Sequence, residues 1–285
     1  MLNNLHVDDD RGNARMTRPA EQLATDGVTV VRGFLAPDDA ADLRRTVYEV
    51  YALLTSSQHV PNRRLATNFR VWDGVWLKAL PTFLRRDRPD LADHYERARR
   101  LVEAQVKRTL GNEWRFFPKR SYFRRHLGMG KKVGWHIDAD GATIFKVAAS
   151  VINVWLPLEA VGGDLPSLEV VPRSHTIMRG VPMLTGAHRA RDDAFVSAAG
   201  ESSSPQLQLG DALIFDQFLL HRTQNAGSSD AVRTSCEFRF VRRSVPSLQT
   251  LSGWARYHWN AVFSSDGALA AAAKRCLDTI SPVKQ

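Results

Sequence analysis

Two side chains that can bind a metal ion lie one residue apart in the segment GWHIDADG, at His136 and Asp138. In an extended strand, side chains at positions i and i+2 project from the same face, so this imidazole and this carboxylate would point the same way. With one further histidine they would form a facial set of two histidines and one carboxylate, which leaves coordination positions open and is diagnostic of non-haem Fe(II) oxygenases. The pair therefore predicts an iron centre whose third ligand comes from another strand.

Two histidines could supply that third ligand, His175 and His221. His221 is favoured, because it ends GDALIFDQFLLH, an apolar stretch that follows a Gly-Asp turn and is typical of a strand. Twelve residues later, Arg233 lies in RTSCEFRFV, a further predicted strand. An arginine can clamp a carboxylate with two parallel hydrogen bonds. A dicarboxylate such as 2-oxoglutarate could therefore bind iron at one end and Arg233 at the other.

Periodicity divides the chain into a helical N-terminal part and a strand-rich remainder. Residues 26–35 predict a short strand. Residues 36–56 predict an amphipathic helix, and residues 90–111 a second helix that ends at a glycine. After residue 112, short stretches rich in β-branched and aromatic residues are separated by Gly, Pro and Asp/Ser turns, which indicates a sandwich or barrel. The predicted fold class is α+β with a β core.

One main domain, residues 19–264, is expected from these patterns. It would contain the helical part, the strand-rich core and a polar, Gly/Ser-rich loop that could close an active site. The expected boundaries are 1–18 for a flexible N-terminal arm, 36–111 for the helical part, 112–243 for the core, 181–206 for the lid loop and 265–285 for a C-terminal helix.

The composition is that of a globular protein with a sizeable core, since 44% of the 285 residues are hydrophobic. No apolar run is long enough to span a membrane, and the polar N-terminus is not typical of a signal peptide. Two cysteines, Cys236 and Cys276, favour reduced thiols and a cytoplasmic location. The net charge is +9, but the basic residues are scattered, so the expected partner is a small molecule rather than nucleic acid or a membrane.

Four segments, in this order, resemble the Fe(II)/2-oxoglutarate-dependent dioxygenases, and within them the phytanoyl-CoA dioxygenase-like family. They are DGVTVVRGFLAPDDAADLRR, GWHIDAD, VINVWLPLEAVGGDLPSLEVVPRSH, and GDALIFDQFLLHRTQN followed by VRTS. The resemblance covers about residues 26–243. It implies a double-stranded β-helix (jelly-roll) core with flanking N-terminal helices. It also implies Fe(II) as metal, 2-oxoglutarate as co-substrate and dioxygen as oxidant.

The resemblance also implies roles for individual residues. It implies that His136, Asp138 and His221 bind iron, and that Arg233 binds the far carboxylate of 2-oxoglutarate. Asp138 stands where the halogenating relatives have a small residue, which argues against halogenation. His175, in PRSH, is implied to be structural or gating. Further candidates for contacts with 2-oxoglutarate are Thr223, Ser235, Tyr122, Arg124 and Asn153.

Some residues near these motifs keep two interpretations. Asn153 lies in SVINVWLPL, where side chains alternate between faces, so it faces either solvent or the barrel interior. Glu237 could face the substrate but is more typical of a turn or surface acid. Trp135 and Trp155 are more typical of packing residues than of substrate platforms, and Cys236 is more typical of a core residue.

The expected function is the oxidation of a small-molecule natural product in antibiotic biosynthesis. Length and general appearance are similar to the aminoglycoside branch of the family. The substrate prediction is therefore an aminoglycoside such as kanamycin B, with an amine-bearing carbon oxidised to a ketone and release of ammonia, succinate and CO2. The alternatives are a hydroxylase of an acyl-CoA, or of another carboxylate or amino-acid metabolite, and a non-catalytic metal- or sugar-binding β-barrel. A nucleic-acid demethylase on the same scaffold would need a second arginine, such as Arg239.

Charge separates the two substrate classes, because a positively charged protein repels a polycationic sugar unless acids gather at the mouth of the site. The candidate acids are Asp140, Asp192, Asp193 and Glu201. An acyl-CoA needs bases there instead. The candidate bases are Lys131, Lys132 and Arg173.

Overall fold

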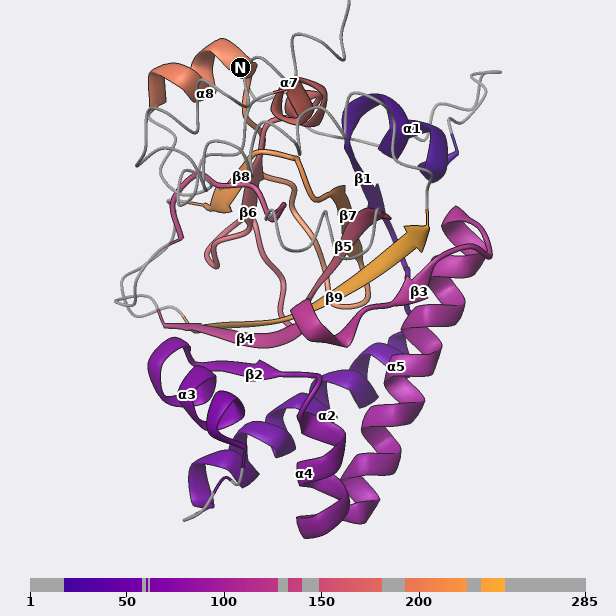
Figure 1. Ribbon diagram of the computed structural model, residues 1–285, viewed down its shortest axis with the longest axis vertical. Helices are drawn as coiled ribbons and strands as arrows, with labels where there is room; N and C mark the ends of the chain where they lie inside the picture. The colour runs from indigo at the N-terminus through magenta and orange to yellow at the C-terminus, as the bar shows by residue number, and fades with distance from the viewer. Residues whose placement is uncertain are drawn as a thin grey trace, which may run out of the picture.

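Two antiparallel sheets and a layer of helices make up the fold (Figure 1). The computed structural model describes residues 18–243 apart from 58–59, 61, 128–132, 140–148, 181–192 and 225–231. A seven-stranded sheet has the order β1-β7-β5-β9-β4-β2, with β3 also paired to β9, and a second sheet pairs β6 with β8. The strands are β1 Val28–Val31, β2 Gly74–Trp76, β3 Arg115–Phe116, β4 Tyr122–Leu127, β5 Ala149–Pro157, β6 Leu168–Val170, β7 Ala212–Asp216, β8 His221–Thr223 and β9 Val232–Arg243.

The two helices predicted from periodicity are present within one residue of their expected ends. They are α2, Pro37–Ser56, and α5, Pro89–Leu110, and each has a proline in its first turn. The remaining helices were not predicted. They are α1 Pro19–Asp26, α3 Arg63–Trp72, α4 Leu80–Asp87, α7 Ser174–Gly180, α8 Asp193–Ala199 and the short 3-10 helix η1 Pro118–Arg120. None of the described helices is long and apolar enough to cross a membrane.

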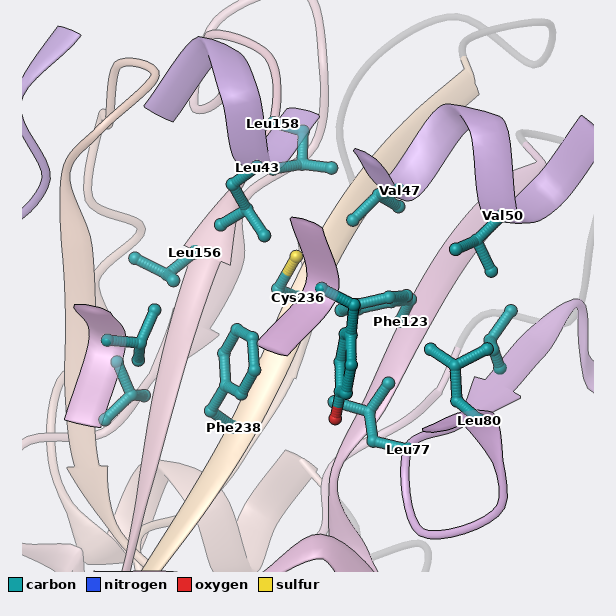
Figure 2. Close-up of a cluster of buried hydrophobic side chains, with 14 of the residues drawn as sticks. Leu43, Val47, Val50, Leu77, Leu80, Phe123, Leu156, Leu158, Cys236 and Phe238 are labelled. Carbon is teal, nitrogen blue, oxygen red and sulfur yellow. The ribbon is translucent and has the colours of Figure 1, made fainter. Parts of the chain in front are cut away.

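One face of the large sheet packs against the helical layer. In Figure 1, α2, α3, α4 and α5 gather beneath β2, β4 and β9. Figure 2 shows the contact, where Val47 of α2 and Phe123 of β4 lie close to Cys236 and Phe238 of β9. Each of these four side chains is fully buried. The burial of this apolar surface ties the helices to the back of the sheet and leaves its other face for the site.

The other face of β9 is polar, because polar and apolar residues alternate along this strand. Side chains two residues apart share a face, so the polar set is opposed to Cys236 and Phe238. The residues of this polar face are Arg233, Ser235, Glu237 and Arg239, all of them buried. Residues directly opposite in an antiparallel pair also share a face, which adds Tyr122 and Arg124 of β4 and Asn153 of β5. Burial of polar side chains on a central strand lowers the stability of the fold unless those side chains are hydrogen-bonded or ion-paired, so such a surface indicates pairing or a bound ligand.

The antiparallel sheets and N-terminal helices confirm the α+β class. The structure differs from the expected subdivision in two places. Strands β1 and β2 belong to the large sheet although they precede residue 112. Within the expected lid loop 181–206, α8 occupies Asp193–Ala199 and Ser203 pairs with Val170. The expected C-terminal helix and all but residue 18 of the expected arm lie outside the described residues.

Candidate metal centre and co-substrate site

His136, Asp138 and His221 come together in space, with one ligand atom from each within 4.8 Å of the others. His136 Nε2 lies 3.9 Å from Asp138 Oδ1, and His221 Nε2 lies 3.6 Å from Asp138 Oδ2. Adjacent ligands on a metal with bonds of about 2.1 Å are roughly 3 Å apart, so a small contraction would close this set around an ion. Two imidazoles and one carboxylate match the facial donor set of non-haem Fe(II).

Backbone hydrogen bonds hold the segment that carries His136 and Asp138 against β8. His136 N donates to His221 O at 2.9 Å, and His221 N donates to His136 O at 3.0 Å. Asp138 N donates to Gln217 O at 2.9 Å. These bonds join residues far apart in the sequence and bring the two motifs into register.

The orientation of both imidazoles leaves Nε2 available for a metal. Nδ1 of His136 lies 2.8 Å from Gly134 O, and Nδ1 of His221 lies 3.0 Å from Leu219 O. A carbonyl oxygen accepts only, so each Nδ1 carries the proton and each Nε2 presents its lone pair. Burial, and then the neighbouring His221, lowers the pKa of His136 to about 3, so this imidazole is neutral at physiological pH.

Arg239 provides the countercharge to Asp138. Its Nη2 lies 2.7 Å from Asp138 Oδ1 and 2.7 Å from Glu237 Oε1. Although burial alone would raise it, the Arg239 guanidinium holds the pKa of Asp138 well below its usual range. The carboxylate is therefore ionised, and its buried Oδ2 has no hydrogen-bond partner among the described residues. An orphaned carboxylate oxygen 3.6 Å from the Nε2 of His221, with the Nε2 of His136 3.9 Å from the other oxygen, fits a bound cation.

Arg233 is a buried cation without a carboxylate partner in the described part of the chain. Its Nη1 donates to the carbonyl oxygens of Pro166 and Ser167, at 3.1 and 3.3 Å, while its Nε is unsatisfied. The guanidinium lies over the ring of Trp155, 5.1 Å from its centroid. Burial, and then Arg124, lowers the pKa of Arg233 to about 10. A guanidinium with free N–H groups can donate hydrogen bonds to a carboxylate.

The other predicted co-substrate residues lie on the same polar interior. Thr223 is buried on β8 opposite Leu168, next to the Ser167 carbonyl that Arg233 contacts. Ser235 Oγ is buried and has no hydrogen-bond partner among the residues that the structure describes. Asn153 is fully buried, and both of its amide atoms lack a partner in the described part of the chain, so it faces the interior rather than solvent. Tyr122 lies opposite Glu237, with the guanidinium of Arg124 over its ring.

Of the remaining interpretations from sequence, one agrees with the structure and one is wrong. His175 lies on α7, with Nε2 3.4 Å from Ala24 O, outside the three-residue cluster. The expectation that Glu237 is a turn or surface acid is wrong, because it is 8% exposed and pairs with Arg124 and Arg239. Arg239 is likewise buried, between the carboxylates of Asp138 and Glu237. The strict alternation in RTSCEFRF could have indicated both residues, since it places them on the face of Arg233.

Residues 23–235 match the family model described as phytanoyl-CoA dioxygenase (PhyH). The chain belongs to this family. It is accordingly an Fe(II)- and 2-oxoglutarate-dependent dioxygenase that uses Fe(II), 2-oxoglutarate and dioxygen. The predicted jelly-roll core with flanking helices is also confirmed, since it is the fold of this family.

Solved structures with the same fold include enzymes of very different sequence. AviO1 from Streptomyces viridochromogenes Tue57 is 18% identical, with a TM-score of 0.55 over 82% of this chain and 99% of AviO1. The epimerase SnoN in complex with Fe3+, alpha ketoglutarate and nogalamycin RO is 18% identical, with a TM-score of 0.55 over 81% of this chain and 87% of SnoN. EctD from S. alaskensis with 2-oxoglutarate and 5-hydroxyectoine is 16% identical, with a TM-score of 0.54 over 84% of this chain and 79% of EctD. No curated protein sequence matches the chain.

Proposed function

We propose that His136, Asp138 and His221 hold Fe(II), and that Arg233 binds the far carboxylate of 2-oxoglutarate. The observation that carries the proposal is a buried guanidinium that pairs with no carboxylate among the described residues, in a polar interior that also holds three clustered metal-ligand side chains. Ser235, two residues after Arg233 on β9, and Thr223 on β8 would provide hydroxyl groups for the same carboxylate. The reaction class of the family needs both parts, a metal to activate dioxygen and an anchor that fixes the co-substrate.

The chain's own groups would act by orientation and by exclusion of water. Fe(II), when bound, supplies the redox chemistry that couples decarboxylation of 2-oxoglutarate to oxidation of a C–H bond. His136 and His221 are fixed by their Nδ1 hydrogen bonds, which aim Nε2 at the metal position. Arg233 would place the co-substrate with two parallel hydrogen bonds, and the ring of Trp155 would shield that ion pair from water.

We further propose a small-molecule natural product of antibiotic biosynthesis as the substrate. The support is similarity of fold to AviO1 of a Streptomyces and to SnoN from nogalamycin biosynthesis. Within that class, the candidate is an aminoglycoside such as kanamycin B, oxidised at an amine-bearing carbon. This candidate requires acids at the mouth of the site, to which Asp140 and Asp192 would have to contribute from outside the described residues.

The charge of the described interior favours the second candidate, an anionic substrate such as an acyl-CoA or another carboxylate. Three arginines, 124, 233 and 239, face two carboxylates, 138 and 237, which leaves one net positive charge. The charges of Fe(II) and of doubly charged 2-oxoglutarate would cancel, so the net positive charge of the side chains would remain. The side chain of Arg124 is 41% exposed although it lies on the inner face of β4, so it is the most exposed of these five charged groups.

Succinate formation with Fe(II), 2-oxoglutarate and ascorbate tests the substrate class. The panel holds kanamycin B and related aminoglycosides, acyl-CoAs, free amino acids and a control without substrate. Stimulation by aminoglycosides alone supports the first candidate, and stimulation by acyl-CoAs or free carboxylates supports the second. Absence of succinate above the metal-free control in every arm would contradict the proposed site.

A further inference from the structure

A single nitrogen of Arg239 bridges two carboxylates, one of which belongs to the candidate metal ligand. Nη2 lies 2.7 Å from both Asp138 Oδ1 and Glu237 Oε1. The Arg239 side chain is 7% exposed, so solvent does not compete for these contacts. Each of the two hydrogens on Nη2 can serve one of the carboxylates. Hydrogen bonds between ionised groups of this kind are short and strong, so they fix the orientation of the Asp138 carboxylate.

The two oxygens of Asp138 are consequently unlike each other. Oδ1 is held by Arg239, whereas Oδ2 is buried, unpartnered among the described residues and 3.6 Å from His221 Nε2. A cation bound by the two imidazoles would meet Oδ2 with its lone pairs free. Oδ1 already accepts a charged hydrogen bond, which fixes the plane of the carboxylate and makes Oδ1 the weaker donor for a second bond to the cation.

We propose that Arg239 is a positioning residue that keeps Asp138 monodentate, so that Fe(II) retains three open coordination positions. This inference rests on the proposed assignment of His136, Asp138 and His221 to the metal. An octahedral ion with three protein ligands has three positions left. The keto acid end of 2-oxoglutarate would take two of them, which would leave the third for dioxygen. A bidentate Asp138 would occupy one of these positions and block either the chelate or dioxygen.

Arg239 is itself fixed by the strand that carries it and by the next ion pair. Its backbone is held on both sides. The amide N donates to Ser121 Oγ at 2.9 Å, and the carbonyl oxygen accepts from Phe117 N at 2.7 Å. Glu237, which shares Nη2 with Asp138, also accepts from Arg124 Nε at 2.8 Å. The four charges alternate along a chain from Asp138 to Arg124, so the row is neutral and each member is oriented by its neighbour.

The test compares the protein with Arg239→Gln, Arg239→Lys and a control, Arg242→Gln, which changes an exposed arginine of the same strand. Loss of the buried cation removes repulsion from the metal position, so Arg239→Gln should bind Fe(II) at least as tightly as the unaltered protein. Nitric oxide then probes the last open position of the anaerobic complex with Fe(II) and 2-oxoglutarate, through its electron paramagnetic resonance signal. That signal, and succinate turnover, should fall about 10-fold or more in Arg239→Gln, the usual cost of losing a residue that orients a metal ligand.

Arg239→Lys keeps a cation and should recover the nitric oxide signal relative to Arg239→Gln, and Arg242→Gln should match the unaltered protein. A full nitric oxide signal in Arg239→Gln would overturn the inference, and so would a joint loss of Fe(II) and nitric oxide binding, which indicates a general structural role. If Arg239→Gln does not fold, Arg239→Gln combined with Glu237→Gln removes both charges of the pair and carries the same prediction. Failure of the unaltered protein to bind Fe(II) or 2-oxoglutarate would instead overturn the proposed function.

Discussion

The buried arginines of this protein differ in whether a carboxylate neutralises them. Arg239 and Arg124 are paired with carboxylates, whereas the described hydrogen bonds of Arg233 go only to carbonyl oxygens. A buried cation without a counterion destabilises the free protein, because its desolvation is not offset by an ion pair. Such a group is retained where a ligand supplies the missing anion.

Arg233→Gln should therefore weaken 2-oxoglutarate. Charged hydrogen bonds contribute roughly 1.5–3 kcal/mol, so the KM for 2-oxoglutarate should rise about 10- to 150-fold. The comparison is Arg45→Gln, whose side chain is 61% exposed on α2. Steady-state kinetics with varied 2-oxoglutarate measures both. An unchanged KM in Arg233→Gln would remove Arg233 from the co-substrate site.

His221→Ala and His136→Ala should abolish iron binding, because each removes one of three protein ligands from a set that already leaves positions open. Iron content after anaerobic loading and desalting should fall from near one per chain to near zero, and succinate formation should fall to the metal-free background. His94→Ala, at an exposed position of α5, is the control and should retain iron. Retention of iron by both triad variants would exclude these histidines as ligands.

At the scale of elements, the site depends on β9, which carries polar residues toward the interior and apolar ones toward the helices. Helix α2 covers the apolar side (Figure 2). Two valines offer a matched test of this packing, since Val47 of α2 is fully buried and Val71 of α3 is 63% exposed.

Val47→Ala should lower the free energy of unfolding by about 1–3 kcal/mol, because it removes two buried methyl groups and leaves a cavity. The same change at Val71 should stay within about 0.5 kcal/mol of the unaltered protein. Urea unfolding followed by circular dichroism measures both variants. Equal losses at the two positions would mean that α2 does not anchor the sheet.

Among the helices, periodicity predicted the two long ones but not the short ones. Helices α2 and α5 show several turns of apolar repetition, whereas α1 and α4 have eight residues each and too few turns for a clear pattern. The HxD spacing indicated that His136 and Asp138 share a direction, but their distance from His221 depends on backbone bonds between distant segments. The Asp138–Arg239 pair is equally nonlocal, so no local pattern predicts it.

On the scale of the whole molecule, ligands that bind only the folded chain should stabilise it. At a 2-oxoglutarate concentration of 100 times its Kd, the Fe(II) form should gain about 2.7 kcal/mol. For a protein of this size that corresponds to a rise in Tm of roughly 4–5 °C. Differential scanning fluorimetry under anaerobic conditions measures the shift. Arg233→Gln should lose most of it at the same concentration, and an undiminished shift in that variant would contradict its role.

The most direct measurement is an anaerobic titration of the Fe(II) protein with 2-oxoglutarate, followed by visible absorption. Chelation of Fe(II) by the keto acid produces a metal-to-ligand charge-transfer band. The band should saturate at one 2-oxoglutarate per iron in the unaltered protein and be absent in His221→Ala. No band in a protein that has bound one Fe(II) per chain, or an equal band in His221→Ala, would contradict the assignment of the site to these residues.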